Sequence, residues 1–130
     1  MSPTGTSPTR ERWRGPALFA QGLRPFFLVA GVWAVFALAV WLAVLQGVGL
    51  PEGPLPMARW HAHEMLAGFV GAALCGFLLT AVPNWTNHQG YGGLPLIGLV
   101  AAFAAARLAL VPGSPLPVAL AATLALLPLP

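Results

Sequence analysis

Long apolar stretches, separated by short segments rich in proline, glycine and polar residues, dominate the chain. The first, Phe26–Leu45, holds about 20 residues without a charge or a proline, which at roughly 1.5 Å per residue matches the roughly 30 Å hydrocarbon core of a bilayer. It predicts a transmembrane helix over about residues 26–48. A secretory signal peptide is the competing interpretation, but its apolar region is only about 7–15 residues long, so an uncleaved span is favoured.

Three more apolar stretches predict helices over about residues 60–82, 94–111 and 116–130. The second stops at Pro83, and the third is interrupted only by Arg107. The fourth has about 15 residues, where about 17–25 are usual for a span. The pattern therefore predicts an all-α fold, a polytopic transmembrane helix bundle with three full spans plus a truncated fourth. We expect the chain to be a fragment of a longer membrane protein.

Composition agrees with this class. Of the 130 residues, 58% are hydrophobic and only 7% are charged, against about 25% charged in a soluble domain. The charged residues are six Arg and three Glu, too few cations for a nucleic-acid surface, so no nucleic-acid partner is expected. The single cysteine, Cys75, excludes an intramolecular disulfide and is interpreted as part of the apolar core.

The arginines indicate how the chain is oriented. Residues 1–15 are rich in Ser, Thr, Pro and Arg, and they predict a disordered tail ahead of a membrane domain over residues 16–130. Arg-rich segments beside a span stay in the cytoplasm, so the N-terminus is expected there. Four of the six arginines lie in the first 24 residues: Arg10, Arg12, Arg14 and Arg24.

Small residues recur every four positions along the second and third stretches. Such stripes let helices approach closely in lipid, although glycine and alanine are also simply common here. We take the stripes as candidate helix contacts. They are Gly68, Ala72 and Gly76 in the second stretch, and Gly98, Ala102 and Ala106 in the third.

Polar residues at membrane depth are costly and are usually functional. In the predicted topology they fall into two layers, one at each end of the spans. The outer layer holds His61, His63, Glu64 and Arg107, and the inner layer holds Arg24, Asn84, Trp85 and His88.

In the outer layer, a regular helix puts His61, Glu64 and Met65 on one face and turns His63 by about 200° from His61. The two histidines therefore cannot chelate one metal, but a lone imidazole suits haem iron, and His with Met or a carboxylate suits copper. Glu64 could accept the ring N–H of His61. The alternative is that these rings sit at the boundary without any chemistry.

Arg107 is predicted at the depth of Glu64, so an ion pair is expected, with snorkelling of Arg107 to the interface as the alternative. The inner layer suggests less chemistry. Arg24 fits the headgroup region at a span start, and Asn84 and Trp85 fit an interfacial span end. His88, in a glycine-rich loop, is predicted to be solvated.

Three strings resemble signature stretches of the NnrS family: GLRPFF at Gly22–Phe27, WHAHEM at Trp60–Met65, and GFLLTAVPNWT at Gly76–Thr86. Their order and their places at span ends agree as well, and the resemblance covers roughly residues 17–110. It implies a multi-pass protein of the bacterial inner membrane that contains haem and copper. The family is linked to the nitric oxide response, nitrosative stress and denitrification.

The resemblance makes His61 and His63 candidate haem or copper ligands, with Met65 as a further cofactor-binding candidate. The other residues on the family pattern are Arg24, Glu64, Asn84 and Trp85. The partners implied are the lipid bilayer, nitric oxide as a ligand, and further C-terminal helices or another subunit.

Two functions of different classes follow. The first is a haem- and copper-binding membrane protein of the nitric oxide response. The second is a transporter-like bundle with a proton or anion path built on Glu64, Arg107 and the histidines. An enzyme that turns nitric oxide over at its haem is a third alternative, for which two histidines are an incomplete set.

Overall fold

The computed structural model describes residues 14–51, 53, 55–88 and 90–114, and within these ranges it is helical with no strand. The all-α prediction is therefore confirmed for this part of the chain. The elements are the 3-10 helix η1 (Ala17–Ala20), α1 (Leu23–Leu45), α2 (Met57–His63), the π-helix η2 (Glu64–Val70), α3 (Gly71–Thr86) and α4 (Leu94–Ala109).

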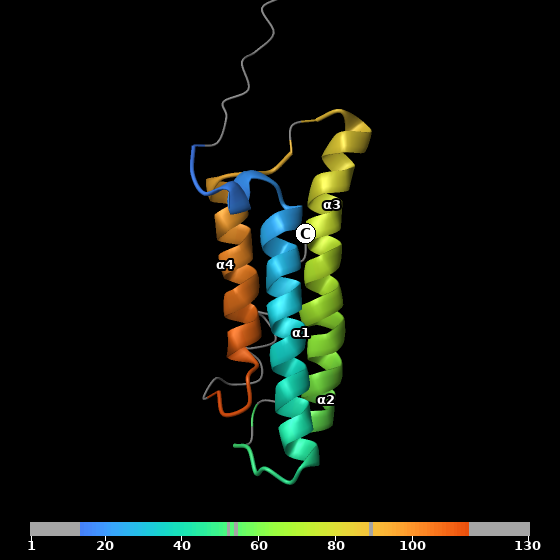
Figure 1. The fold of residues 1–130 in the computed structure, drawn as a ribbon, viewed down its shortest axis with the longest axis vertical. Helices are drawn as coiled ribbons and strands as arrows, with labels where there is room; N and C mark the ends of the chain where they lie inside the picture. Colours follow the sequence, from blue (N-terminus) through green and yellow to red (C-terminus); the bar gives the residue numbers. More distant parts are fainter. Residues whose placement is uncertain (1–13, 52, 54, 89, 115–130) are drawn as a thin grey trace, which may run out of the picture.

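Three rods lie roughly side by side (Figure 1). The segments α2, η2 and α3 follow one another without a break and form one rod of 30 residues, Met57–Thr86. In the view of Figure 1, α1 lies between this rod and α4. The chain descends through α1, returns through α2 to α3, and descends again through α4, so α1 is antiparallel to the long rod.

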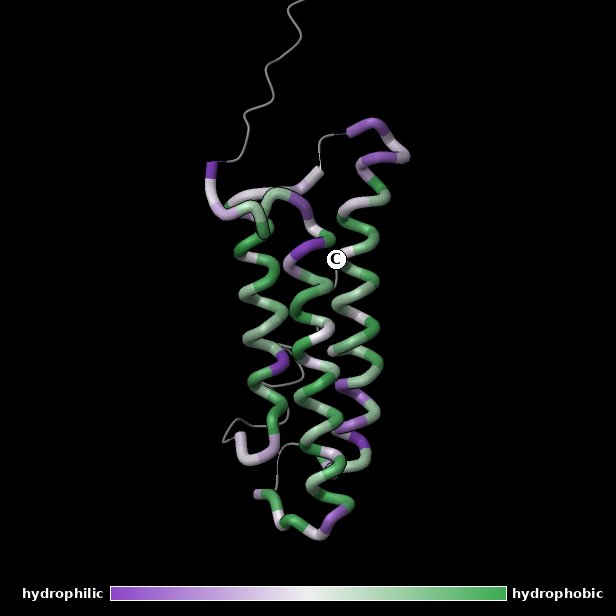
Figure 2. Tube along the Cα trace, in the orientation of Figure 1, coloured by the Kyte–Doolittle hydropathy of each residue, from purple (hydrophilic) through white to green (hydrophobic). Residues whose placement is uncertain are grey.

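Two of the rods are long and apolar enough to cross a membrane: α1, with 23 residues, and Met57–Thr86. Both leave large apolar side chains exposed, among them Val32 and Val35 on α1, which fits a membrane protein. Figure 2 shows that hydrophobic residues follow one another along most of the length of both rods. Helix α4 has 16 residues, fewer than the usual span, so the third full span is not reached in the structure. The fourth stretch, 116–130, and nearly all of the tail, 1–15, lie outside the described residues and stay predictions.

The second helix is longer than predicted at both ends. It begins at Met57, directly after Pro56, and it continues through Pro83 to Thr86. Proline inside a helix cannot donate the backbone hydrogen bond of its turn. The last turn of α3 is nevertheless closed, because the backbone N–H groups of Asn87 and His88 both donate to the Pro83 carbonyl. Pro83 therefore does not end the helix as predicted.

The small residues of the second stretch pack against α1, as predicted. Gly68, Ala72 and Gly76 are all buried. A Cβ atom added at Gly76 would lie 2.8 Å from the Cβ of Phe26, so the two backbones approach too closely for a side chain there.

The stripe predicted in the third stretch is wrong. In the part of the chain that the structure describes, Gly98 has no atom within 4 Å of where its Cβ would be and Ala102 is exposed, so of the three residues Ala106 alone is buried there. Helix α4 instead turns larger side chains inward, and the ring of Phe103 meets that of Phe26 edge to face at 5.8 Å. Aromatic packing, not close backbone approach, sets this contact.

A test of the packing is Gly76→Ala, which we expect to lower the free energy of unfolding by about 1–3 kcal/mol, because overpacking forces the Phe26 backbone away. The matched control is Gly98→Ala, whose new methyl group meets open space. Both variants are compared with the parent chain by denaturant titration in mixed micelles. Equal stabilities of the two variants would contradict the packing.

Candidate functional site

The carboxylate of Glu64 is the centre of the candidate site. Its side chain is 0% exposed, and its two oxygens have different partners. Oε2 accepts a hydrogen bond of 2.6 Å from Nε1 of Trp33 on α1. Oε1 lies 2.9 Å from Nδ1 of His63 and 3.7 Å from Nη1 of Arg107 on α4. All three rods therefore converge on one acidic side chain.

Glu64 is also where the long rod changes its winding. The α-helix ends at His63, and Glu64 begins the π-helix η2, in which hydrogen bonds span five residues rather than four. Single π turns inside α-helices are rare and often occur at functional sites. From Glu64 to Val70, the altered winding means that a regular helical wheel does not describe which side chains share a face.

Arg107 compensates the buried negative charge. Its side chain is 2% exposed, and its guanidinium carbon lies 5.4 Å from the centre of the Phe103 ring. The structure thus brings Arg107 and Glu64 together, and Arg107 does not snorkel to the surface. In Figure 2 the hydrophilic segments on α4 and on the long rod lie at a similar height inside green surroundings.

The His61 ring forms no hydrogen bond with the Glu64 carboxylate in the described structure, although the helical wheel put the two residues on one face. Its ring stacks on Trp41 of α1, with ring centres 4.9 Å apart and an angle of 14° between the planes. Its Nδ1 is buried and has no hydrogen-bond partner among the described residues. The histidine beside the carboxylate is His63, whose Nδ1 lies 2.9 Å from Oε1 of Glu64.

The inner layer lies at the other end of the rods and takes no part in this site. Arg24 is exposed and donates from Nη1 to the carbonyl of Ala17 at 3.0 Å. Asn84 is exposed, and Trp85 is 71% exposed with only an edge contact to Phe77. His88 is exposed as well, as its loop position predicted.

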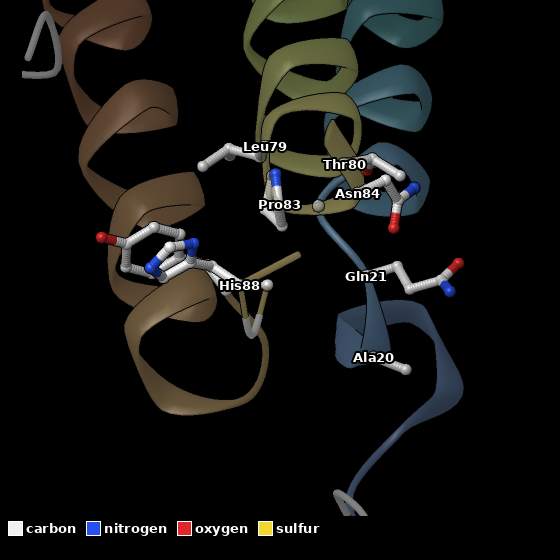
Figure 3. A pocket seen from close by; sticks show the side chains of 10 residues that line it. Ala20, Gln21, Leu79, Thr80, Pro83, Asn84 and His88 are labelled. Atoms are coloured by element: carbon white, nitrogen blue, oxygen red, sulfur yellow. The ribbon is translucent and has the colours of Figure 1, made fainter. Parts of the chain in front are cut away.

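This end nevertheless holds a cavity of about 260 Å³ between the start of α1 and the end of α3. Figure 3 shows Gln21 and Asn84 on one side of it in this view and His88 on the other. Thr80, also in its lining, accepts from the backbone N–H of Leu23 at 3.0 Å and donates to the Gly76 carbonyl at 3.1 Å. The hydroxyl thereby satisfies an N–H that the first turn of α1 leaves without a helical partner.

The comparisons with known proteins identify the family. The family described as NnrS protein matches residues 17–130, which is most of the chain and includes all three signature strings. The chain belongs to the NnrS family. No curated protein and no solved structure matches it.

The haem and copper implied by this family can be tested against the side chains of the NnrS chain. Nowhere in the described ranges do three or more His, Cys, Asp or Glu side chains gather as they would around a metal ion. His61 and His63 have separate surroundings, and Met65 packs on the apolar cluster around Trp60. A metal held by several of these residues therefore does not fit.

A single histidine ligand does fit, and His63 is the one with the matching surroundings. A carboxylate only accepts hydrogen bonds, so an ionised Glu64 would pair with a proton on Nδ1 of His63 and leave Nε2 as the nitrogen available to a metal. Metal-binding histidines usually donate their second N–H to such a carboxylate. The His63 side chain is 35% exposed, so it can be approached from outside the three rods.

Two residues of the structure's polar network did not emerge from the sequence. Trp33 lies inside an uncharged apolar run, which predicts a span and does not single out this residue. An indole N–H at membrane depth nevertheless needs an acceptor, and that need was the available signal. Thr80 lies inside a signature string and could have been found by the same reasoning.

The ion pair makes a prediction about the stability of the NnrS chain. Glu64→Ala leaves the Arg107 charge buried without its acid, so we expect a loss of about 3–5 kcal/mol of unfolding free energy. The double variant Glu64→Ala/Arg107→Met removes both charges and should recover a large part of that loss. Unfolding in mixed micelles measures both. Additive losses in a double-mutant cycle would show that the two groups do not interact.

Proposed function

We propose that this NnrS chain helps to bind haem in a membrane protein of the nitric oxide response, and that His63 supplies the ligand nitrogen. The observation that carries the proposal is the 2.9 Å contact between Nδ1 of His63 and Oε1 of the buried Glu64. Such a contact fixes the ring and its tautomer and raises the basicity of the opposite nitrogen. A histidine nitrogen is a common axial ligand of haem iron.

Each residue around His63 has a role in this proposal. Glu64 orients the imidazole, and Arg107 balances the charge of Glu64 inside apolar surroundings. When bound, the haem would supply an iron atom to which nitric oxide can bind. We extend the proposal to a role in nitrosative stress and denitrification, which family membership supports.

Copper, the second metal implied by the family, has less support from the described residues. His61 offers one buried nitrogen without a hydrogen-bond partner, and one nitrogen is not a copper site. We propose that copper, if His61 binds it, is completed by ligands from further helices or another subunit. The proposed setting is a multi-pass protein of the bacterial inner membrane with a cytoplasmic N-terminus.

The ligand assignment is tested with the chain purified from membranes in detergent and loaded with haem. We expect His63→Ala to remove most of the Soret absorption or shift it, because the iron loses its axial nitrogen. His61→Ala should leave the Soret band in place.

The matched control is His88→Ala, which removes an exposed imidazole at the other end of the rods. A Soret band that survives His63→Ala and is lost in His61→Ala would assign the ligand to the other histidine. A chain that takes up no haem would refute the proposal.

A second candidate function is a proton or anion path, which the buried pair of Glu64 and Arg107 favours. His63 connects the carboxylate with the surface of the bundle, because it is hydrogen-bonded to Glu64 and partly exposed. For this function, we expect purified protein without metal to carry pH-dependent flux in liposomes, and Glu64→Gln to abolish it. Metal in the purified protein without flux would favour haem binding instead.

A further inference from the structure

Trp33 and Gly68 are parts of the site to which neither the family match nor the ligand proposal gives a role. We propose that Trp33 is a positioning residue for His63, acting through Glu64, and that position 68 must be glycine to leave room for its indole ring. The part that concerns haem rests on the proposed function, whereas the arrangement of the side chains does not.

The two carboxylate oxygens of Glu64 are used for different purposes. The indole N–H of Trp33 holds Oε2 at 2.6 Å, which leaves Oε1 toward His63 and Arg107. The last torsion of a glutamate side chain is soft and roughly two-fold, so a carboxylate without such a donor can rotate. The bond from Trp33 restricts this rotation and keeps Oε1 in place for Nδ1 of His63.

Gly68 lies one turn beyond Glu64, inside the π-helix, and the indole ring fills the space above it. A Cβ atom at this position would lie 2.5 Å from Cδ1 and 2.6 Å from Nε1 of Trp33, and 2.8 Å from Oε2 of Glu64. All three distances are shorter than real Cβ contacts allow, so any side chain at 68 pushes apart the donor and the acceptor of this hydrogen bond.

A purely packing role for Trp33 makes a different prediction. The ring also lies against Phe36, with ring centres 5.1 Å apart, and phenylalanine at position 33 would keep most of that contact. Phenylalanine has no N–H, so Trp33→Phe separates the hydrogen bond from the packing.

The decisive readout is the tautomer of His63, measured by nitrogen NMR on the haem-free chain in micelles at a pH where the ring is neutral. In the parent chain, we expect the proton to be mostly on Nδ1. In Trp33→Phe and in Gly68→Ala, we expect a mixture of the two tautomers, because Glu64 is no longer held. Each variant should also weaken haem binding several-fold and shift the Soret band.

Two controls match these variants. Gly71→Ala adds a methyl group to the same rod, where it meets only the Leu66 carbonyl at an ordinary 3.6 Å, and it should leave the tautomer unchanged. Trp41→Phe removes an indole from the same helix α1, next to His61 instead of His63, and should leave the His63 tautomer unchanged.

Retention of the Nδ1-protonated form in Trp33→Phe would overturn the positioning role. Should Gly68→Ala fail to fold, Trp33→Phe still decides the question. A chain that takes up no haem, yet has a His63 tautomer that depends on Trp33, would refute the proposed function and support the positioning role. Loss of the Soret band in His63→Ala together with an unchanged Soret band in Trp33→Phe would support the proposed function and contradict the positioning role.

Discussion

A carboxylate inside an apolar bundle must be paired, and this constraint organises the structure. Burying an isolated charge in a low-dielectric medium costs many times the net stability of a protein, so Glu64 needs donors on every side from which water is excluded. The donors come from three separate rods, as Trp33 on α1, His63 on the long rod and Arg107 on α4. The acid therefore links all three rods at one point, in addition to the apolar packing between them.

Close helix packing makes this arrangement possible. Between α1 and the long rod, Gly68 and Gly76 have no side chain and Ala72 has only a methyl group, so the backbones can approach closely. Because the two helices lie close together, the indole N–H of Trp33 can donate a hydrogen bond to Glu64 on the neighbouring helix. The contact with α4 is of another kind, since it is made by larger side chains, among them the edge-to-face pair Phe26 and Phe103, and by Arg107, which reaches Glu64.

Much of the fold, but less of the site, could be predicted from the sequence. The lengths of the apolar stretches predicted the two long helices, since burial in lipid depends mainly on composition, and family membership followed from three local strings. Similar depth was enough to pair Arg107 with Glu64. The helical wheel put the wrong histidine beside the acid because it does not show where a ring points: His61 stacks on Trp41, and His63 turns to Glu64. No local signal announced the π-helix that begins at Glu64. The α4 stripe was wrong because composition does not show which face of a helix meets a neighbour.

The π-helix divides the long rod into two halves with different rotational phase. An α-helix advances about 100° per residue, so one residue more or less between the halves turns one relative to the other by that amount. The lower half presents the histidines, and the upper half presents Ala72 and Gly76 to α1. Apart from Glu64 and Gly68, the segment Glu64–Val70 can therefore tolerate substitutions more readily than insertions or deletions, because a change in length would rotate His61 and His63 relative to Ala72 and Gly76. Among relatives, the length of this segment should vary less than its side chains at positions other than 64 and 68.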